Sequence, residues 1–108
     1  MNAELKDRWV AALRSGAYDQ CTSCLWDADN NQYCCLGVLC DIYDPDGWNF
    51  DDIERDNEVE YCGEADALSA AVRLGVGLSK NMMRRLINMN DTNCNDFDEI
   101  ADYIEAAL

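Results

Sequence analysis

Apolar residues recur at helical spacing over residues 3–15. This stripe predicts a helix from about Ala3 to Ser15, because side chains three and four positions apart share one face of a helix. Asn2 is a suitable N-cap for this helix, and Gly16 lies where a helix commonly ends. The residues of the stripe are Leu5, Trp9, Val10 and Leu13.

Two short β-prone runs, residues 24–26 and 32–34, flank the polar segment 27–31, and this pattern predicts a β-hairpin. The apolar run that follows, residues 34–43, predicts a short buried helix in its second part. We expect this helix to end at Asp-Pro-Asp-Gly, residues 44–47. Proline in the second position and glycine in the fourth match a type I turn.

Three further helices are expected in the second half of the chain. The first covers residues 65–74 and ends at Gly75, and the second covers about residues 80–89 with Ser79 as its cap. The last opens at its cap Asn95 and reaches Leu108. The sequence therefore predicts an α+β fold that is mostly helical, with about four to five short helices packed with one small β-hairpin.

The length of 108 residues and the apolar fraction of 49% predict one globular domain, residues 1–108. Within it, residues 44–64 form a long acidic connection. The charged start of the chain argues against a signal peptide, and no apolar run is long enough to span a membrane. The odd number of cysteines fits reduced thiols, so we expect a cytoplasmic protein.

The net charge of −14 is unevenly distributed. Residues 41–66 hold eleven acids and one base, whereas residues 67–90 hold no acid and four bases. A chain this acidic repels nucleic acid and anionic membranes and attracts basic protein surfaces. The cationic stretch has the length of a helix-turn-helix, but the excess of acids elsewhere argues against direct DNA binding. The expected partner is a protein with a basic surface.

The acidic connection is the main candidate binding surface. Its carboxylates could attract a basic partner, and its aromatic side chains could anchor that partner. The alternative is a solvated segment whose aromatic residues only pin it to the core. The candidate residues are Asp44, Asp46, Trp48, Phe50, Asp51, Asp52, Glu54, Asp56, Glu58 and Glu60.

Cysteines cluster between residues 21 and 40. Cys21 and Cys24 have the spacing of a zinc knuckle, and Cys34, Cys35 or Cys40 could complete a four-sulfur site. Adjacent residues of a strand point to opposite sides, which argues against that site. We therefore favour buried thiols in an apolar run, and a disulfide between Cys21 and Cys24, or to Cys94, is a further alternative.

Catalysis has little support in the sequence. The chain has no histidine, which is the commonest general base, and it has no glycine-rich phosphate loop. We expect neither an enzyme nor a bound cofactor. A small-molecule or nucleotide-signal binder is an alternative, because a phosphate needs cationic donors, and Arg73, Arg84 and Arg85 could supply them.

Three segments carry a resemblance to a known family. They are residues 8–20 (RWVAALRSGAYDQ), residues 33–41 (YCCLGVLCD), and Asn90-Asp91 together with residues 97–105 (FDEIADYIE). In this order they resemble small uncharacterised proteins encoded by tailed phages and prophages. The resemblance implies a phage accessory protein that acts in the bacterial cytoplasm, and it assigns no catalytic or binding residue.

These observations lead to three functional hypotheses. The first is a non-enzymatic phage protein that binds and inhibits a host protein through an acidic, DNA-mimic-like surface. Its target would be a nucleic-acid-handling defence component, as for an anti-CRISPR protein. The second is a small-molecule or nucleotide-sequestering protein, and the third is a zinc-stabilised structural module.

Overall fold

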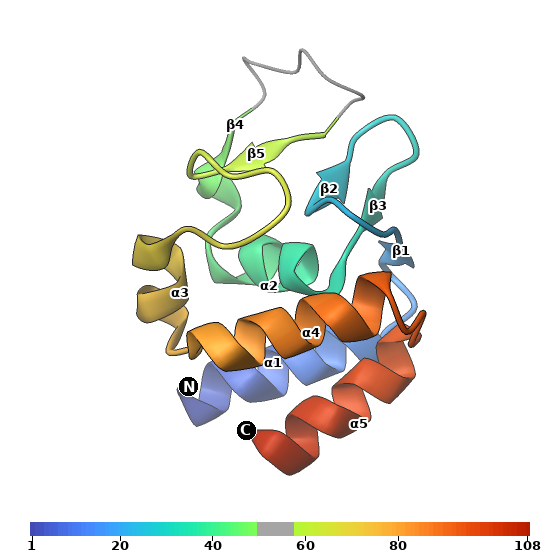
Figure 1. Cartoon of the computed structure of the whole chain (residues 1–108), viewed down its shortest axis with the longest axis vertical. Helices are drawn as coiled ribbons and strands as arrows, with labels where there is room; N and C mark the ends of the chain where they lie inside the picture. The colour runs from blue at the N-terminus through green and yellow to red at the C-terminus, as the bar shows by residue number, and fades with distance from the viewer. Residues whose placement is uncertain (50–57) are drawn as a thin grey trace.

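Helices occupy the lower part of the molecule in Figure 1 and two small sheets the upper part. The computed structural model describes residues 1–49 and 58–108. These residues form an α+β globule that is mostly helical, as predicted. No described helix combines the length and the apolar character needed to cross a membrane. The helices are α1 (Ala3–Arg14), α2 (Cys35–Tyr43), α3 (Ala70–Val76), α4 (Lys80–Asp91) and α5 (Phe97–Ala107), with a 3₁₀ turn η1 (Pro45–Gly47) after α2.

The predicted hairpin is part of a three-stranded sheet. Strands β2 (Trp26–Asp27) and β3 (Gln32–Tyr33) are antiparallel, and β1 (Asp19–Gln20) joins the other edge of β3 in parallel. A second antiparallel pair, β4 (Trp48–Asn49) and β5 (Glu60–Tyr61), was not predicted. Strands β2, β4 and β5 lie above α2 in Figure 1, whereas β1 lies level with it, and Gln20 of β1 donates to the carbonyl of Asn95 just before α5.

Helix α1 begins and ends as its sequence predicts. The side chain of Asn2 accepts hydrogen bonds from the backbone N–H groups of Glu4 and Leu5, which satisfies two of the free donors at the helix start. Its apolar face packs against α2 and α5. Trp9 is fully buried there, and its indole N–H donates to the carbonyl of Cys35 at 3.0 Å. This bond joins α1 to the start of α2.

The predicted boundaries of α3 and α5 need correction. Helix α3 starts at Ala70, because the Ser69 hydroxyl caps it, and it ends at Gly77 rather than Gly75. Gly77 adopts φ +76°, the left-handed conformation that glycine tolerates best. Helix α5 is capped by Asp96 rather than Asn95, in a reciprocal capping box with Glu99.

The cysteine-rich helix α2 lies at the centre of the core. Residues from Cys35 to Cys40 are buried, as the apolar run predicts. Gly37 lies directly against the backbone of Leu25, where a Cβ would overlap the carbonyl oxygen. The hairpin can therefore approach α2 at backbone contact distance only because this position is a glycine.

Candidate functional site

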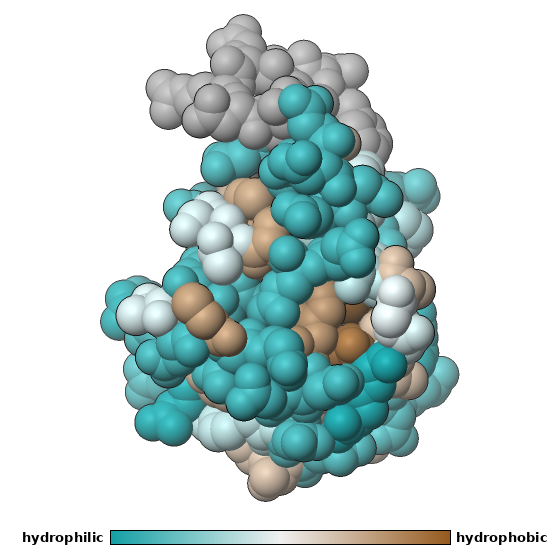
Figure 2. All heavy atoms as spheres, turned by 90° about the vertical axis from the view of Figure 1, so that its right-hand side faces the viewer, coloured by the Kyte–Doolittle hydropathy of each residue, from teal (hydrophilic) through white to brown (hydrophobic). Residues whose placement is uncertain are grey.

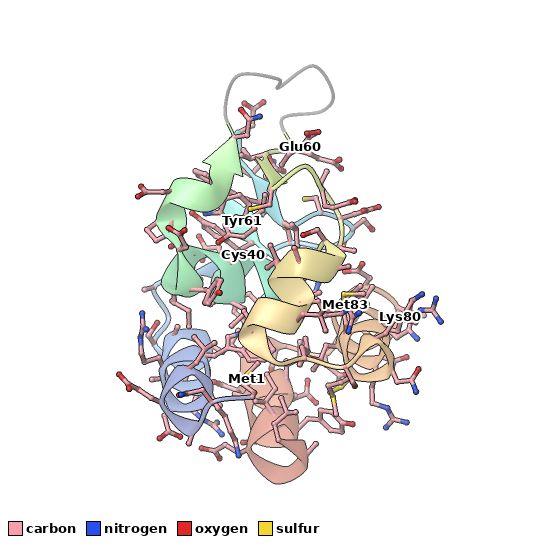
Figure 3. All side chains as sticks on the ribbon, turned by 90° about the vertical axis from the view of Figure 1, so that its left-hand side faces the viewer. Met1, Cys40, Glu60, Tyr61, Lys80 and Met83 are labelled. Atoms are coloured by element: carbon pink, nitrogen blue, oxygen red, sulfur yellow. The ribbon has the colours of Figure 1, made fainter. Side chains whose placement is uncertain are left out.

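The two sheets are joined into one end of the molecule. The N–H of Val59 donates to the carbonyl of Trp26 at 3.0 Å, and Asp27 and Glu58 form a β-bridge beside it. We call the carboxylates around these sheets the acidic end. In Figure 3, Glu60 lies near the outer limit of this end, with Tyr61 and Cys40 progressively deeper. The members of the acidic end are Asp27, Asp29, Asp44, Asp46, Glu58, Glu60 and Glu64.

The acidic end includes some of the predicted partner-binding residues. Asp44 and Asp46 are exposed, and Glu58 and Glu60 are partly buried. The structure adds carboxylates from the β2–β3 turn, which sequence reasoning did not connect with the acidic connection. The other predicted residues lie outside the described part of the chain: Phe50, Asp51, Asp52, Glu54 and Asp56.

Two carboxylates of the acidic end are held in place by backbone hydrogen bonds. Asp27 accepts bonds from Asn30 and Asp29, and these bonds, led by the Asn30 side chain, lower the pKa of Asp27. Asp44 accepts from the N–H of Asp46 at 3.0 Å, and so caps the 3₁₀ turn. Negative charge is thus fixed in position by the turns themselves.

A cluster of aromatic side chains lies beneath the acidic end. Trp48 is only 7% exposed, and its indole N–H donates to one oxygen of Asp41 while the Tyr18 hydroxyl donates to the other. The Trp48 side chain is therefore part of the core and not an exposed anchor for a partner. This agrees with the alternative in which the aromatic residues of segment 44–64 fix it to the core. The ring contacts, with centroids 4.9–6.2 Å apart, link Tyr18, Trp26, Tyr33, Trp48 and Tyr61.

The exposed apolar side chains near the acidic end are Tyr43 and Leu74. Tyr43, the last residue of α2, is 42% exposed and directly precedes Asp44, and Leu74 on α3 is 69% exposed. The predicted buried helix is thus exposed at its last residue, Tyr43. The Tyr43 hydroxyl lies beside Gly75, so α3 and the end of α2 are neighbours. Sequence reasoning missed this pair, because burial at a helix end depends on tertiary neighbours.

The cysteines differ in burial. Cys24, Cys34, Cys35 and Cys40 are buried, in agreement with the buried-thiol prediction, whereas Cys21 is partly buried and Cys62 and Cys94 are exposed. The sulfurs of Cys21 and Cys24 are 3.5 Å apart. Hydrogen bonding to Cys21 and burial both raise the pKa of the Cys24 thiol.

The structure does not bring the predicted zinc ligands together. Cys34 caps α2 by accepting from the N–H of Gly37, whereas the Cys35 thiol donates to the carbonyl of Leu86. Across residues 1–49 and 58–108, no three cysteine or carboxylate side chains are arranged to hold a metal ion. The pair Cys21 and Cys24 therefore gains no further ligand from the described residues.

The three predicted cationic ligands are also divided. Arg73 donates to the carbonyl of Leu78 at 3.1 Å and so helps to close the end of α3. Arg84 and Arg85, on α4, line an open concavity of about 580 Å³ between α4 and α5. The other residues that line it are Asn81, Asn88, Met89, Asn93, Asn95 and Tyr103.

Charges of opposite sign are largely kept apart. The ion pairs that described residues make with one another join Arg14 of α1 to Asp102 and Glu105 of α5. The arginines of α4 form no ion pair with another residue of the described part. The face drawn in Figure 2 is mostly hydrophilic, with small hydrophobic areas between polar ones.

Fold and surface together define a small acidic α+β module with buried thiols. The chain belongs to a family described as a domain of unknown function, DUF8296, whose model matches residues 1–83. This match covers both sheets and ends within α4. No curated protein and no solved structure matches the chain.

Proposed function

We propose that this chain is a non-enzymatic phage accessory protein that binds and inhibits a host protein through its acidic end. The target would be a nucleic-acid-handling defence component with a basic groove. The observation that carries the proposal is the fixed set of carboxylates around the two sheets, in a chain with net charge −14. Such a set attracts a cationic surface and orients its approach.

Two further observations support a protein partner. The aromatic cluster beneath the sheets holds the acidic end in one conformation, which reduces the entropy lost on binding. Tyr43 adds an exposed aromatic side chain directly beside Asp44, and Leu74 lies on the neighbouring helix. Aromatic residues dominate the energetics of protein interfaces.

Affinity capture from bacterial lysate, at low and at high salt, tests the proposal. The bait is the intact chain, compared with D46K/E60K, which reverses two charges of the acidic end. We expect a nucleic-acid-binding protein to be captured at low salt and to be lost at high salt or with D46K/E60K. Y43A should also reduce capture, because it removes the exposed aromatic side chain beside Asp44.

A matched control separates the acidic end from net charge. D7K/D98K makes the same change in net charge on the exposed surfaces of α1 and α5, outside the two sheets. Near-UV circular dichroism checks that each variant is folded. The proposal fails if no partner is captured from host lysate, or if D7K/D98K abolishes capture as completely as D46K/E60K.

A further inference from the structure

The concavity between α4 and α5 has a composition unlike the rest of the chain. Acids outnumber bases 22 to 8 in the sequence, yet the described residues that line this concavity include two arginines and no carboxylate. Four asparagines add amide groups, each of which offers both donors and an acceptor. The site is therefore a local cationic and polar surface on an acidic protein.

The arginines are available for a ligand. Arg84 and Arg85 are exposed, and neither forms an ion pair with a described residue. The guanidinium of Arg85 lies 5.8 Å from the centre of the Tyr103 ring, within the range of a cation–π contact. This contact links α4 to α5 and orients Arg85 before any ligand binds.

The volume of the site suits a small molecule. A volume of about 580 Å³ lies in the range of sites that bind drug-sized molecules. Planar guanidinium groups hold phosphate oxygens through two parallel hydrogen bonds. Amide side chains such as those of Asn81 and Asn88 can pair with the edge of a heterocyclic ring.

We infer that this concavity binds a small phosphorylated ligand of the nucleotide class, with Arg84 and Arg85 on the phosphates and the asparagines on the ring. This site is separate from the acidic end, and the inference does not rest on protein binding. Arg73, the third cation of the sequence hypothesis, is not part of the site, because it closes the end of α3.

Isothermal titration of the intact protein with ATP, at low ionic strength, tests the inference. Pyrophosphate and adenosine are titrated separately to distinguish the phosphate from the ring. We expect saturable binding of ATP, weaker binding of pyrophosphate and no detectable binding of adenosine. R84Q should weaken ATP binding by about tenfold or more, and R84K should restore only part of it, since lysine lacks the planar fork.

K80Q is the matched control, because Lys80 lies on the same helix and carries the same charge outside the concavity. Figure 3 shows Lys80 at the outer surface of α4. We expect K80Q to change ATP affinity by less than about twofold, through long-range charge alone. The inference is overturned if the unmodified protein does not bind ATP, if adenosine binds as tightly as ATP, or if K80Q and R84Q weaken binding equally. Circular dichroism establishes that both variants are folded.

Discussion

Asn90 donates its side-chain amide to the backbone carbonyl of Cys21 at 2.9 Å, across 69 positions of sequence. The same amide donates to Asp91, and its oxygen accepts from the side chain of Gln20 and the N–H of Cys35. Asn90 is 1% exposed and has every polar atom of its side chain in use. It joins the end of α4 to the start of α2 and to the chain after β1.

Replacing Asn90 by alanine should destabilise the protein by about 2–4 kcal/mol. The substitution leaves the buried N–H of Cys35 and the partly buried carbonyl of Cys21 without this partner, and unpaired buried polar groups are costly. Urea unfolding measures the effect. Asn88→Ala is the control on the same helix, and because Asn88 is exposed we expect a change within about 0.5 kcal/mol. Equal losses from the two variants would contradict the role given to Asn90.

Two helical glycines should respond in opposite ways to alanine. At Gly37 a Cβ would overlap the carbonyl of Leu25, so Gly37→Ala should destabilise by about 3 kcal/mol although alanine favours helix. At Gly75 the nearest atom is the hydroxyl at the end of the exposed Tyr43 side chain, which can rotate away. Gly75→Ala should therefore be neutral or slightly stabilising. Thermal melting of both variants checks the pair, and a stable Gly37→Ala variant would refute the backbone contact.

Stability should fall in alkaline solution. Burial, together with the charge of Asp41, raises the pKa of Tyr33 to about 12, from 10.0. The folded state favours the neutral phenol. The contribution of Tyr33 to the free energy of unfolding is therefore complete below about pH 10 and is lost as the pH rises through about 12. Burial also raises the pKa of the Cys35 thiol to about 12, from 9.0, so the decline begins near pH 9.

Tyr33→Phe isolates the tyrosine contribution, because it keeps the ring and removes the ionisable group. We expect this variant to lose less stability than the unmodified protein between pH 10 and pH 12. Urea unfolding at a series of pH values measures both curves. Parallel curves would show that Tyr33 does not contribute to the alkaline decline.

Mild oxidation should link Cys21 to Cys24. Their sulfurs are 3.5 Å apart, so a shift of about 1.5 Å reaches the usual disulfide bond length. With diamide as oxidant, the two thiols lose two electrons and two protons to the azo group, which becomes a hydrazine. Peptide mapping by mass spectrometry should find the internal bond, and Cys21→Ser should abolish it. A product in which Cys21 is linked only to Cys62 or Cys94 would contradict this prediction.

Local signals were sufficient for α1, α2 and the hairpin. The apolar stripe and the Asn2 cap define α1 without help from distant residues. The start of α3 required tertiary information, because the carbonyl of Ala65 accepts from the N–H of Leu25 and keeps residues 65–69 out of the helix. A hydrogen bond to a distant segment overrode a sequence that favours helix.

The candidate sites depended still more on distant contacts. Strands β4 and β5 have two residues each, which is too short for an alternating pattern of apolar and polar residues. The pairing of Trp48 with Tyr61 therefore could not be predicted from the sequence. The residues that line the α4–α5 concavity lie between Asn81 and Tyr103 in the sequence. The positions of the arginines in the sequence did not show that Arg73 instead contacts the end of α3. The distribution of charge along the sequence indicated an acidic and a cationic surface. The packing of the helices and strands determined which side chains belong to each surface.

The pairing of β4 with β5 makes these two strands a natural point for grafting foreign sequence. Asn49 and Glu60 are register partners on adjacent strands, and Val59 is fixed to Trp26 of the other sheet. Asn49 and Glu60 are therefore neighbours in the described fold. Because closure entropy grows only slowly with the length of the inserted chain, a recognition peptide spliced between these positions should leave the helical core unchanged. The module could in this way serve as a small scaffold for displaying peptides.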